Sequence, residues 1–159
     1  MKMTIDAKLP DLRLGKLVAI ALLSLAVSPA LAEEAPLLTA YEGKYPHDAT
    51  LPHFLMHPLV AQAVERVVPD AEVRQRLLAP DGPKTPIWIA GGRIHSWGCE
   101  AHLCGPHNWM ISMELDGSAP EICYHKASSS DAGARWYREG ECEVRDYQCP
   151  AGKPGSRDG

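Results

Sequence analysis

Residues 99–107 read Cys-Glu-Ala-His-Leu-Cys-Gly-Pro-His and carry more chemical information than any other stretch of the chain. Two cysteines with four residues between them can form a disulfide that closes a small ring, and His102 lies inside that ring. If Cys99 and Cys104 are oxidised, the ring is a rigid loop that presents an imidazole. If they are reduced, the same stretch has the spacing Cys-x2-His-x-Cys-x2-His, which suits zinc or copper. The redox state of the protein's compartment therefore decides which chemistry is available.

The first 32 residues have the layout of a secretory signal peptide. Four basic side chains precede an apolar run of 11 residues, and a small-x-small triplet at residues 30–32 follows Pro29. This order predicts cleavage after Ala32. The apolar run is shorter than the roughly 20 residues that a membrane span needs, although an uncleaved anchor helix is the alternative. We therefore expect an exported protein in the periplasm, or outside the cell, with no membrane contact after removal of the signal.

All five cysteines lie beyond residue 98. Disulfides form and persist in an oxidising compartment, whereas thiolate metal sites are usually cytosolic, so export favours a Cys99–Cys104 disulfide. The spacing of Cys142 and Cys149 favours a second disulfide between them, which leaves Cys123 over. Cys123 could instead pair with either of these two C-terminal cysteines. The odd cysteine is then a free thiol or joins two chains, so the sequence leaves a homodimer open.

Composition limits the size and the partners of the mature protein. Removal of residues 1–32 leaves 127 residues, enough for one domain with its own core. These residues contain 12 Lys and Arg against 18 Asp and Glu, a formal charge near −6. This charge argues against nucleic acid and anionic lipid as partners and favours a basic protein, although ordinary solubility is the simpler explanation. No catalytic triad order, nucleophile elbow, phosphate loop or paired-carboxylate motif is present, so we expect neither an enzyme nor a cofactor.

The mature chain divides into an arm, a domain and a tail. Residues 33–52 are rich in proline and show no clear period, so they predict an extended N-terminal arm. Residues 53–149 form the predicted domain. Residues 150–159 are rich in glycine and proline and predict a disordered tail.

Periodic patterns in the domain predict an α+β fold. Apolar residues at three- and four-residue steps predict a helix over residues 58–68, which Pro69 ends, and Asp70 is a suitable N-cap for a second short helix. Alternating and short apolar runs then predict the strands of an antiparallel β-meander. These runs are residues 87–90, 93–98, 109–116 and 121–125, with residues 135–137 as a further strand or a docking segment and residues 127–133 as a flexible loop. The cysteine ring is expected at the tip of a hairpin, clear of the sheet.

This arrangement resembles the family called inhibitor of vertebrate lysozyme (Ivy). The signature loop of that family is Cys-Lys-Pro-His-Asp-Cys, followed by a hydrophobic strand, a turn of the Asp-Gly type and another strand. Cys99, His102 and Cys104 match the signature, and Gly98 and Gly105 fit its usual surroundings. Outside the loop, the likeness extends over roughly residues 45–137 as a pattern rather than as identity.

The chain also departs from the Ivy signature. Glu100 stands in place of Lys, Ala101 in place of Pro and Leu103 in place of Asp, and three cysteines lie outside the signature. The Asp-to-Leu difference removes a polar contact that the resemblance would imply. The chain is therefore similar to a divergent branch of the family, with a target that can differ from vertebrate lysozyme.

The resemblance implies a protein inhibitor of peptidoglycan-cleaving enzymes that protects the cell from host defence. The expected partner is a lysozyme or a lytic transglycosylase, into whose catalytic cleft the Cys99–Cys104 loop inserts. The residues expected to make the contact are Glu100, Ala101, His102, Leu103 and His107. The first alternative is a periplasmic metal-binding protein that uses Cys99, His102, Cys104 and His107. The second is that His102 is only a surface histidine in a disulfide-stapled turn.

Overall fold

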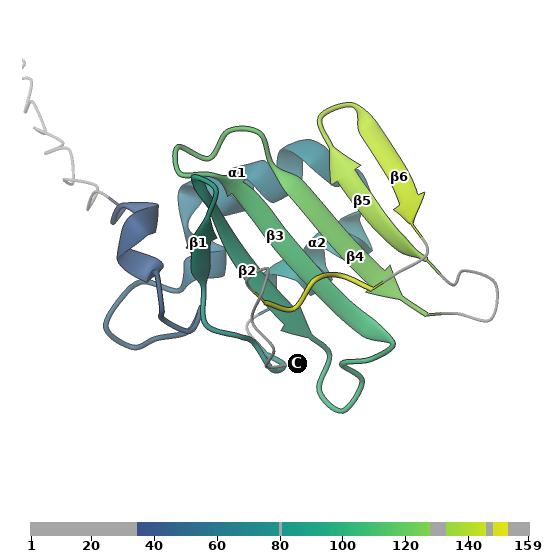
Figure 1. The fold of residues 1–159 in the computed structure, drawn as a ribbon, viewed down its shortest axis with the longest axis horizontal. Coiled ribbons are helices and arrows are strands. Elements are labelled where there is room, and N and C mark those ends of the chain that lie inside the picture. Colours follow the sequence, from purple (N-terminus) through teal and green to yellow (C-terminus); the bar gives the residue numbers. More distant parts are fainter. Residues whose placement is uncertain (1–34, 80, 128–132, 146–147, 153–159) are drawn as a thin grey trace, which may run out of the picture. The chain divides into compact units, whose positions relative to one another are not determined.

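The computed structural model describes residues 35–79, 81–127, 133–145 and 148–152 (Figure 1). Within these ranges the chain forms a six-stranded antiparallel sheet whose strands follow one another in sequence order. The strands are β1 (Trp88–Ala90), β2 (Arg93–Cys99), β3 (His107–Glu114), β4 (Glu121–Lys126), β5 (Ala134–Arg138) and β6 (Glu141–Arg145). Two helices, α1 (Pro58–Val67) and α2 (Ala71–Leu78), lie against one face of the sheet. The predicted α+β class and the antiparallel meander are confirmed.

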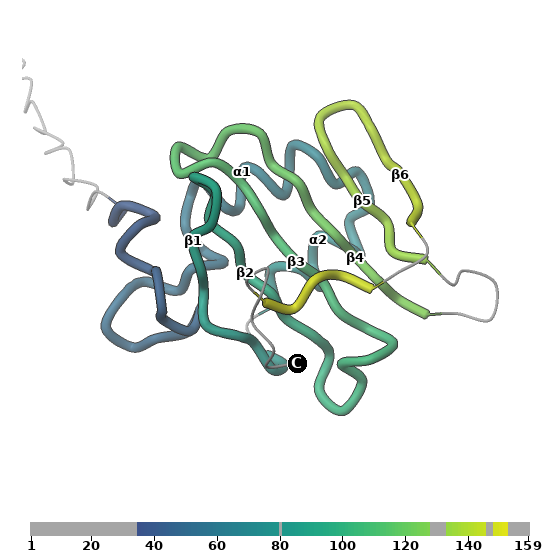
Figure 2. Tube along the Cα trace, viewed as in Figure 1, coloured from purple at the N-terminus to yellow at the C-terminus, as the bar shows by residue number. Residues whose placement is uncertain are grey.

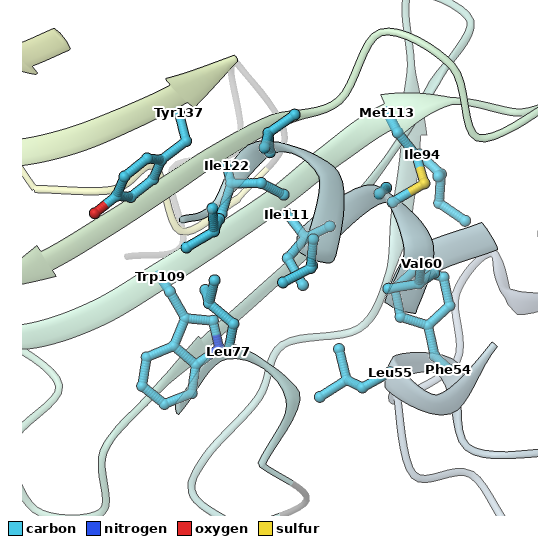
Figure 3. Close-up of a cluster of buried hydrophobic side chains, with 14 of the residues drawn as sticks. Phe54, Leu55, Val60, Leu77, Ile94, Trp109, Ile111, Met113, Ile122 and Tyr137 are labelled. Carbon is cyan, nitrogen blue, oxygen red and sulfur yellow. The ribbon is translucent and has the colours of Figure 1, made fainter. Parts of the chain in front are cut away.

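Alternation along β3 builds the main hydrophobic core. Trp109, Ile111 and Met113 point to the helix side of the sheet, and all three are buried. They pack with side chains from the helical segment, including Val60 of α1 and Leu77 of α2 (Figure 3). The period of two in the sequence therefore records which side chains of this central strand face the helices.

Each of the two helices begins at a residue whose side chain accepts hydrogen bonds from backbone N–H groups of the first turn. Asp70 Oδ1 accepts hydrogen bonds from the N–H groups of Glu72 and Val73 at 2.9 and 3.2 Å, which confirms its predicted role as N-cap of α2. At α1, His57 Nδ1 accepts from Leu59 N–H at 3.2 Å, while His57 Nε2 donates to the Pro36 carbonyl at 2.9 Å. His57 thus joins the start of α1 to the N-terminal segment.

The prediction of an extended N-terminal arm is wrong for part of its length. Leu38–Tyr41 form a 3-10 helix, η1, and the side chains of Leu38 and Tyr41 are buried. The Tyr41 ring packs edge-on against Phe54, with 5.2 Å between the ring centroids. The sequence pattern missed this element because a single 3-10 turn is too short to show a period.

The structure does not describe most of the two chain ends or of the loop between β4 and β5. The predicted signal peptide at residues 1–32 lies outside the described residues, as do residues 128–132 of the predicted flexible loop and residues 153–159 of the predicted tail. Residues 135–137 belong to β5, which settles their two alternatives in favour of a strand. β6 was not predicted, because its residues carry mostly exposed polar side chains and no apolar alternation.

Candidate functional site

The predicted ring is present as a disulfide-closed loop between β2 and β3. Cys99 and Cys104 are bonded to each other, with 4.8 Å between their Cα atoms, and this confirms the predicted pairing. The loop extends beyond the ends of β2 and β3 (Figure 1). Cys99 is buried at the end of β2, whereas residues 101–103 are exposed at the tip.

Short-range backbone hydrogen bonds give the loop a defined shape. Leu103 N–H donates to the Glu100 carbonyl at 3.0 Å, and His107 N–H donates to the Leu103 carbonyl at 2.7 Å. The stem is closed by Glu100 N–H, which donates to the His107 carbonyl at 3.1 Å. The disulfide and these three bonds restrain the same few residues, so the loop is held at both its tip and its stem.

His102 lies at the tip of the loop in a left-handed backbone conformation, with φ of 66°. Its side chain is exposed, and no hydrogen bond or ion pair joins it to another of the described residues. Leu103 beside it is 39% exposed, and Ala101 on its other side is also exposed. The tip therefore presents one imidazole with both ring nitrogens available, flanked by two apolar side chains.

Glu100 and His107 were expected among the contact residues, but the structure brings them together at the stem. His107 Nδ1 donates to Glu100 Oε2 at 2.8 Å, and Arg76 Nη1 of α2 lies 3.4 Å from the same oxygen. The hydrogen bond from His107 lowers the pKa of the Glu100 carboxyl group below its ordinary value, and the positive charge of Arg76 acts in the same direction. These side chains tie the loop to α2 rather than extend from it, whereas Ala101, His102 and Leu103 form the exposed tip.

A groove of about 620 Å³ lies beside the loop, between α2 and the turn that precedes β1. Glu100 and Ala101 belong to both the loop and the groove. The lining residues are Glu72, Gln75, Arg76, Ala79, Asp81, Gly82, Glu100, Ala101 and Trp109. The groove therefore adjoins the loop and presents a mixed polar and apolar surface.

The predicted Cys142–Cys149 disulfide is wrong: Cys149 is bonded to Cys123, with 5.6 Å between their Cα atoms. Cys142 on β6 lies opposite Tyr137, whose side chain belongs to the helix-side core. Cys123 on β4 lies opposite Met110, and both pack with Cys149 in a smaller cluster on the other face. Residues 148–152 pass over this second face (Figure 2). Cys142 and Cys149 are close in sequence but lie on opposite faces of the sheet. Sequence separation does not show this, because alternate residues of a strand point to opposite faces.

Asn108 is a residue that the sequence patterns did not identify as part of the site. It lies directly opposite Cys99 across the β2–β3 ladder, and its side chain is 1% exposed. Its side-chain amide contacts both the loop and the segment around Cys149. Asn108 is the second residue of β3, and in the sequence an asparagine four residues after the ring cannot be distinguished from a polar turn residue.

The oxidation state of the cysteines bears on compartment and on metal binding. Cys142 is a free, exposed thiol, and the other four cysteines form two disulfides, which indicates an oxidising, exported environment. In this state the sulfur atoms of Cys99 and Cys104 are bonded to each other and are not thiolate ligands. Within the described ranges, no group of three or more His, Cys, Asp or Glu residues is arranged to hold a metal ion. In the same part of the chain, no helix has the length and apolar character needed to cross a membrane.

Comparison of the chain with protein-family models, with curated proteins and with solved structures gives no match. The likeness to Ivy therefore rests on the residues of the loop and on the order of the elements around it.

Proposed function

We propose that this protein is an exported inhibitor of a lysozyme-like muramidase, and that its Cys99–Cys104 loop enters the catalytic cleft of the enzyme. The observation that carries this proposal is the exposed His102 imidazole at the tip of a disulfide-closed loop. The proposal takes its target from the resemblance to Ivy and its mechanism from the geometry of the loop.

An imidazole suits the chemistry of such a cleft. Lysozyme-type glycosidases cleave sugar chains with two carboxyl groups, of which one acts as an acid and the other is ionised. Each nitrogen of the His102 ring can form a hydrogen bond, and both nitrogens are donors when the ring is charged. A carboxylate nearby favours that charged form. One side chain can therefore bridge both catalytic groups and displace substrate and water.

Restraint of the loop reduces the entropic cost of inhibition. Binding of a mobile loop loses the free energy needed to order its backbone and side chains. In this protein the disulfide and the backbone bonds at residues 100, 103 and 107 hold the loop before any partner arrives. The imidazole can thus enter a cleft with little rearrangement.

The departures from the Ivy signature are compatible with this mechanism. Glu100 would repel an acidic cleft if its charge were presented there, but His107 and Arg76 bind its carboxylate at the stem. Leu103 replaces a polar contact with an exposed apolar side chain. We therefore expect the target to offer an apolar surface beside its catalytic carboxyl groups, where the Ivy loop would find a hydrogen-bond donor.

The charge of the mature chain favours a basic enzyme. The formal charge near −6 would attract a basic lysozyme or lytic transglycosylase over a distance set by the ionic strength. The proposed site of action is the periplasm, where an inhibitor would protect peptidoglycan from an enzyme that has crossed the outer boundary of the cell. Association should accordingly be faster at low salt than at high salt.

The test is a cell-wall lysis assay with a panel of lysozymes and lytic transglycosylases and the chain lacking residues 1–32. The wild type is compared with His102→Ala and with His47→Ala, because His47 is also exposed and lies outside the loop. We expect the wild type and His47→Ala to inhibit at least one enzyme equally and His102→Ala to lose most of that inhibition. If the wild type inhibits no enzyme of the panel, the proposed function is wrong. If inhibition survives His102→Ala unchanged, the mechanism is wrong.

A further inference from the structure

Asn108 connects the disulfide-closed loop to the segment that follows β6. Its Nδ2 group donates hydrogen bonds to the carbonyl oxygens of Cys104 and Gly105 at 2.8 and 2.9 Å. Its Oδ1 atom accepts a hydrogen bond from Cys149 N–H at 3.1 Å. Both donor hydrogens and the acceptor of this buried amide are thus in use.

The two carbonyl groups that Asn108 binds lie where the loop returns toward the sheet. Cys104 closes the ring, and Gly105 is the first residue after it. The backbone bonds of Leu103 and His107 flank these positions but do not involve the carbonyls of residues 104 and 105. Without the Asn108 amide these two oxygens lose their described protein donors. Residues 104 and 105 then keep the disulfide, while the nearest remaining hydrogen bonds join Ala127 N–H to the Pro106 carbonyl and His107 N–H to the Leu103 carbonyl.

Cys149 determines which way the Asn108 amide points. A backbone N–H can only donate, so the atom that faces Cys149 must be the amide oxygen, and the NH₂ group must face the loop. Were the amide reversed, an oxygen would face two carbonyl oxygens and an NH₂ group would face an N–H. The position of Cys149 N–H therefore selects the orientation in which Asn108 binds the loop.

The second disulfide holds Cys149 in that position. Cys149 is bonded to Cys123 of β4, and both side chains are buried in the small cluster on the face away from the helices. Asn108 lies on the same face, because it is two residues from Met110 along β3 and Met110 lies opposite Cys123. The Cys123–Cys149 disulfide is in this way connected to the loop through the Asn108 side chain on β3.

We infer that Asn108 is a positioning residue for the His102 loop and that the Cys123–Cys149 disulfide acts on the loop through it. This inference rests on the proposed function only in that a positioned loop is needed for inhibition. The residues concerned do not touch the partner: Asn108 and Cys149 are buried, and the expected contact surface is residues 101–103. The two cysteines, which are extra to the Ivy signature, thus acquire a role in the site.

The test uses the chain without residues 1–32 and three sets of variants. Asn108→Ala removes the amide, and Cys123→Ser combined with Cys149→Ser removes the disulfide while both loop cysteines remain. Ser112→Ala is the matched control, because Ser112 is buried on the same strand and the same face but contacts Arg93 instead of the loop. Backbone ¹⁵N order parameters of residues 101–105 and of β3 report mobility within the folded state, and lysis assays report inhibition.

We expect both test variants to lower the order parameters of residues 101–105 from about 0.85 to below about 0.6, with those of β3 unchanged. The concentration for half-inhibition should rise about tenfold, because the loop must now be ordered on binding. Ser112→Ala should change neither quantity. A variant that is merely less stable keeps the wild-type order parameters in its folded fraction, so this readout separates positioning from general destabilisation.

Two results would overturn the inference. One is a loop whose order parameters stay at the wild-type values in both test variants. The other is increased loop mobility with unchanged inhibition. If Asn108→Ala does not fold, the disulfide variant decides the question alone. If the wild type inhibits no muramidase, the proposed function fails, while the order parameters still decide whether Asn108 and the disulfide position the loop.

Discussion

A side chain at position 82 would collide with the main chain of Cys99. Gly82 has φ of +88°, and a Cβ atom built on it would lie 2.3 Å from the Cys99 carbonyl oxygen. The neighbouring Pro83 carbonyl accepts a hydrogen bond from Cys99 N–H at 3.0 Å. The turn before β1 is thus packed closely against the residue at which the ring begins.

This contact predicts different effects of alanine at two glycines. Gly43 also has positive φ, +76°, but nothing lies within 4 Å of its missing Cβ. Gly43→Ala should therefore lower the free energy of unfolding by only about 1–2 kcal/mol, the cost of the left-handed backbone. Gly82→Ala should cost at least about 1 kcal/mol more, because the turn or Cys99 must move. Denaturant unfolding of both variants measures the difference, and equal losses would contradict the predicted contact.

The backbone at His102 makes asparagine the informative replacement for the imidazole. Asn tolerates positive φ better than Ala does, so His102→Asn should keep the backbone conformation and the stability of the wild type. It should still weaken inhibition by about 30-fold or more, as the loss of a central contact residue does. Unfolding curves and lysis assays on the same samples test both statements. Wild-type inhibition by His102→Asn would show that the imidazole does not carry the contact.

Removal of one or the other disulfide should have different effects on stability and on inhibition. In the chain-entropy description, a bridge that spans 5 residues contributes about 2 kcal/mol and one that spans 26 contributes about 3.5 kcal/mol. Replacement of Cys123 and Cys149 by Ser should thus destabilise the fold more than replacement of Cys99 and Cys104. Inhibition should be weakened more by replacement of Cys99 and Cys104, because only this pair encloses His102. The same ranking of the two variants in both assays would argue against the loop as the inhibitory element.

The contacts of the ionised Glu100 carboxylate at the stem of the loop should persist at pH values below the ordinary pKa of a glutamate carboxyl group. The pKa of Glu100 is lowered in the folded protein, so the stability that its ionised form contributes is present at neutral pH and is lost only as the pH falls through that lowered pKa. Because the hydrogen bond from His107 is the largest cause, His107→Ala should raise the pKa of Glu100 toward its ordinary value more than Arg76→Ala does. Carbon-detected NMR titration of the Glu100 carboxyl group in the wild type, His107→Ala and Arg76→Ala measures the three pKa values and shows which variant raises the pKa more.

Cys142 should be the one thiol of the chain that reacts without denaturant. It is exposed on β6, whereas the other four cysteines are in disulfides. One equivalent of a thiol reagent should be taken up per chain, and Cys142→Ser should take up none. Because no other described cysteine can pair with it, any disulfide-linked dimer that forms in oxidant should also disappear in this variant. A second reactive thiol would mean that one of the two disulfides is absent.

Local patterns in the sequence were sufficient for the parts of the fold that depend on near neighbours. The helical period of residues 58–68 and the alternation of residues 109–116 predicted α1 and β3, because each reflects one buried face. Asp70 was recognised as a cap because its side chain binds N–H groups only two and three residues away. The Cys99–Cys104 pair could be predicted because the two cysteines are close in the chain, flank a predicted hairpin tip and follow a predicted export signal.

The tertiary structure decided the contacts between residues that are distant in the chain. Cys149 pairs with Cys123 because the two lie on the same sheet face, while the nearer Cys142 faces the helices. Glu100 meets Arg76 of α2, and Asn108 meets Cys149, only after the sheet has brought these segments together. A sequence records which face each residue of a strand takes, but it does not record which distant segment will cover that face. For this reason the ring and its histidine could be identified from the chain alone, whereas the groups that hold the loop in place could not.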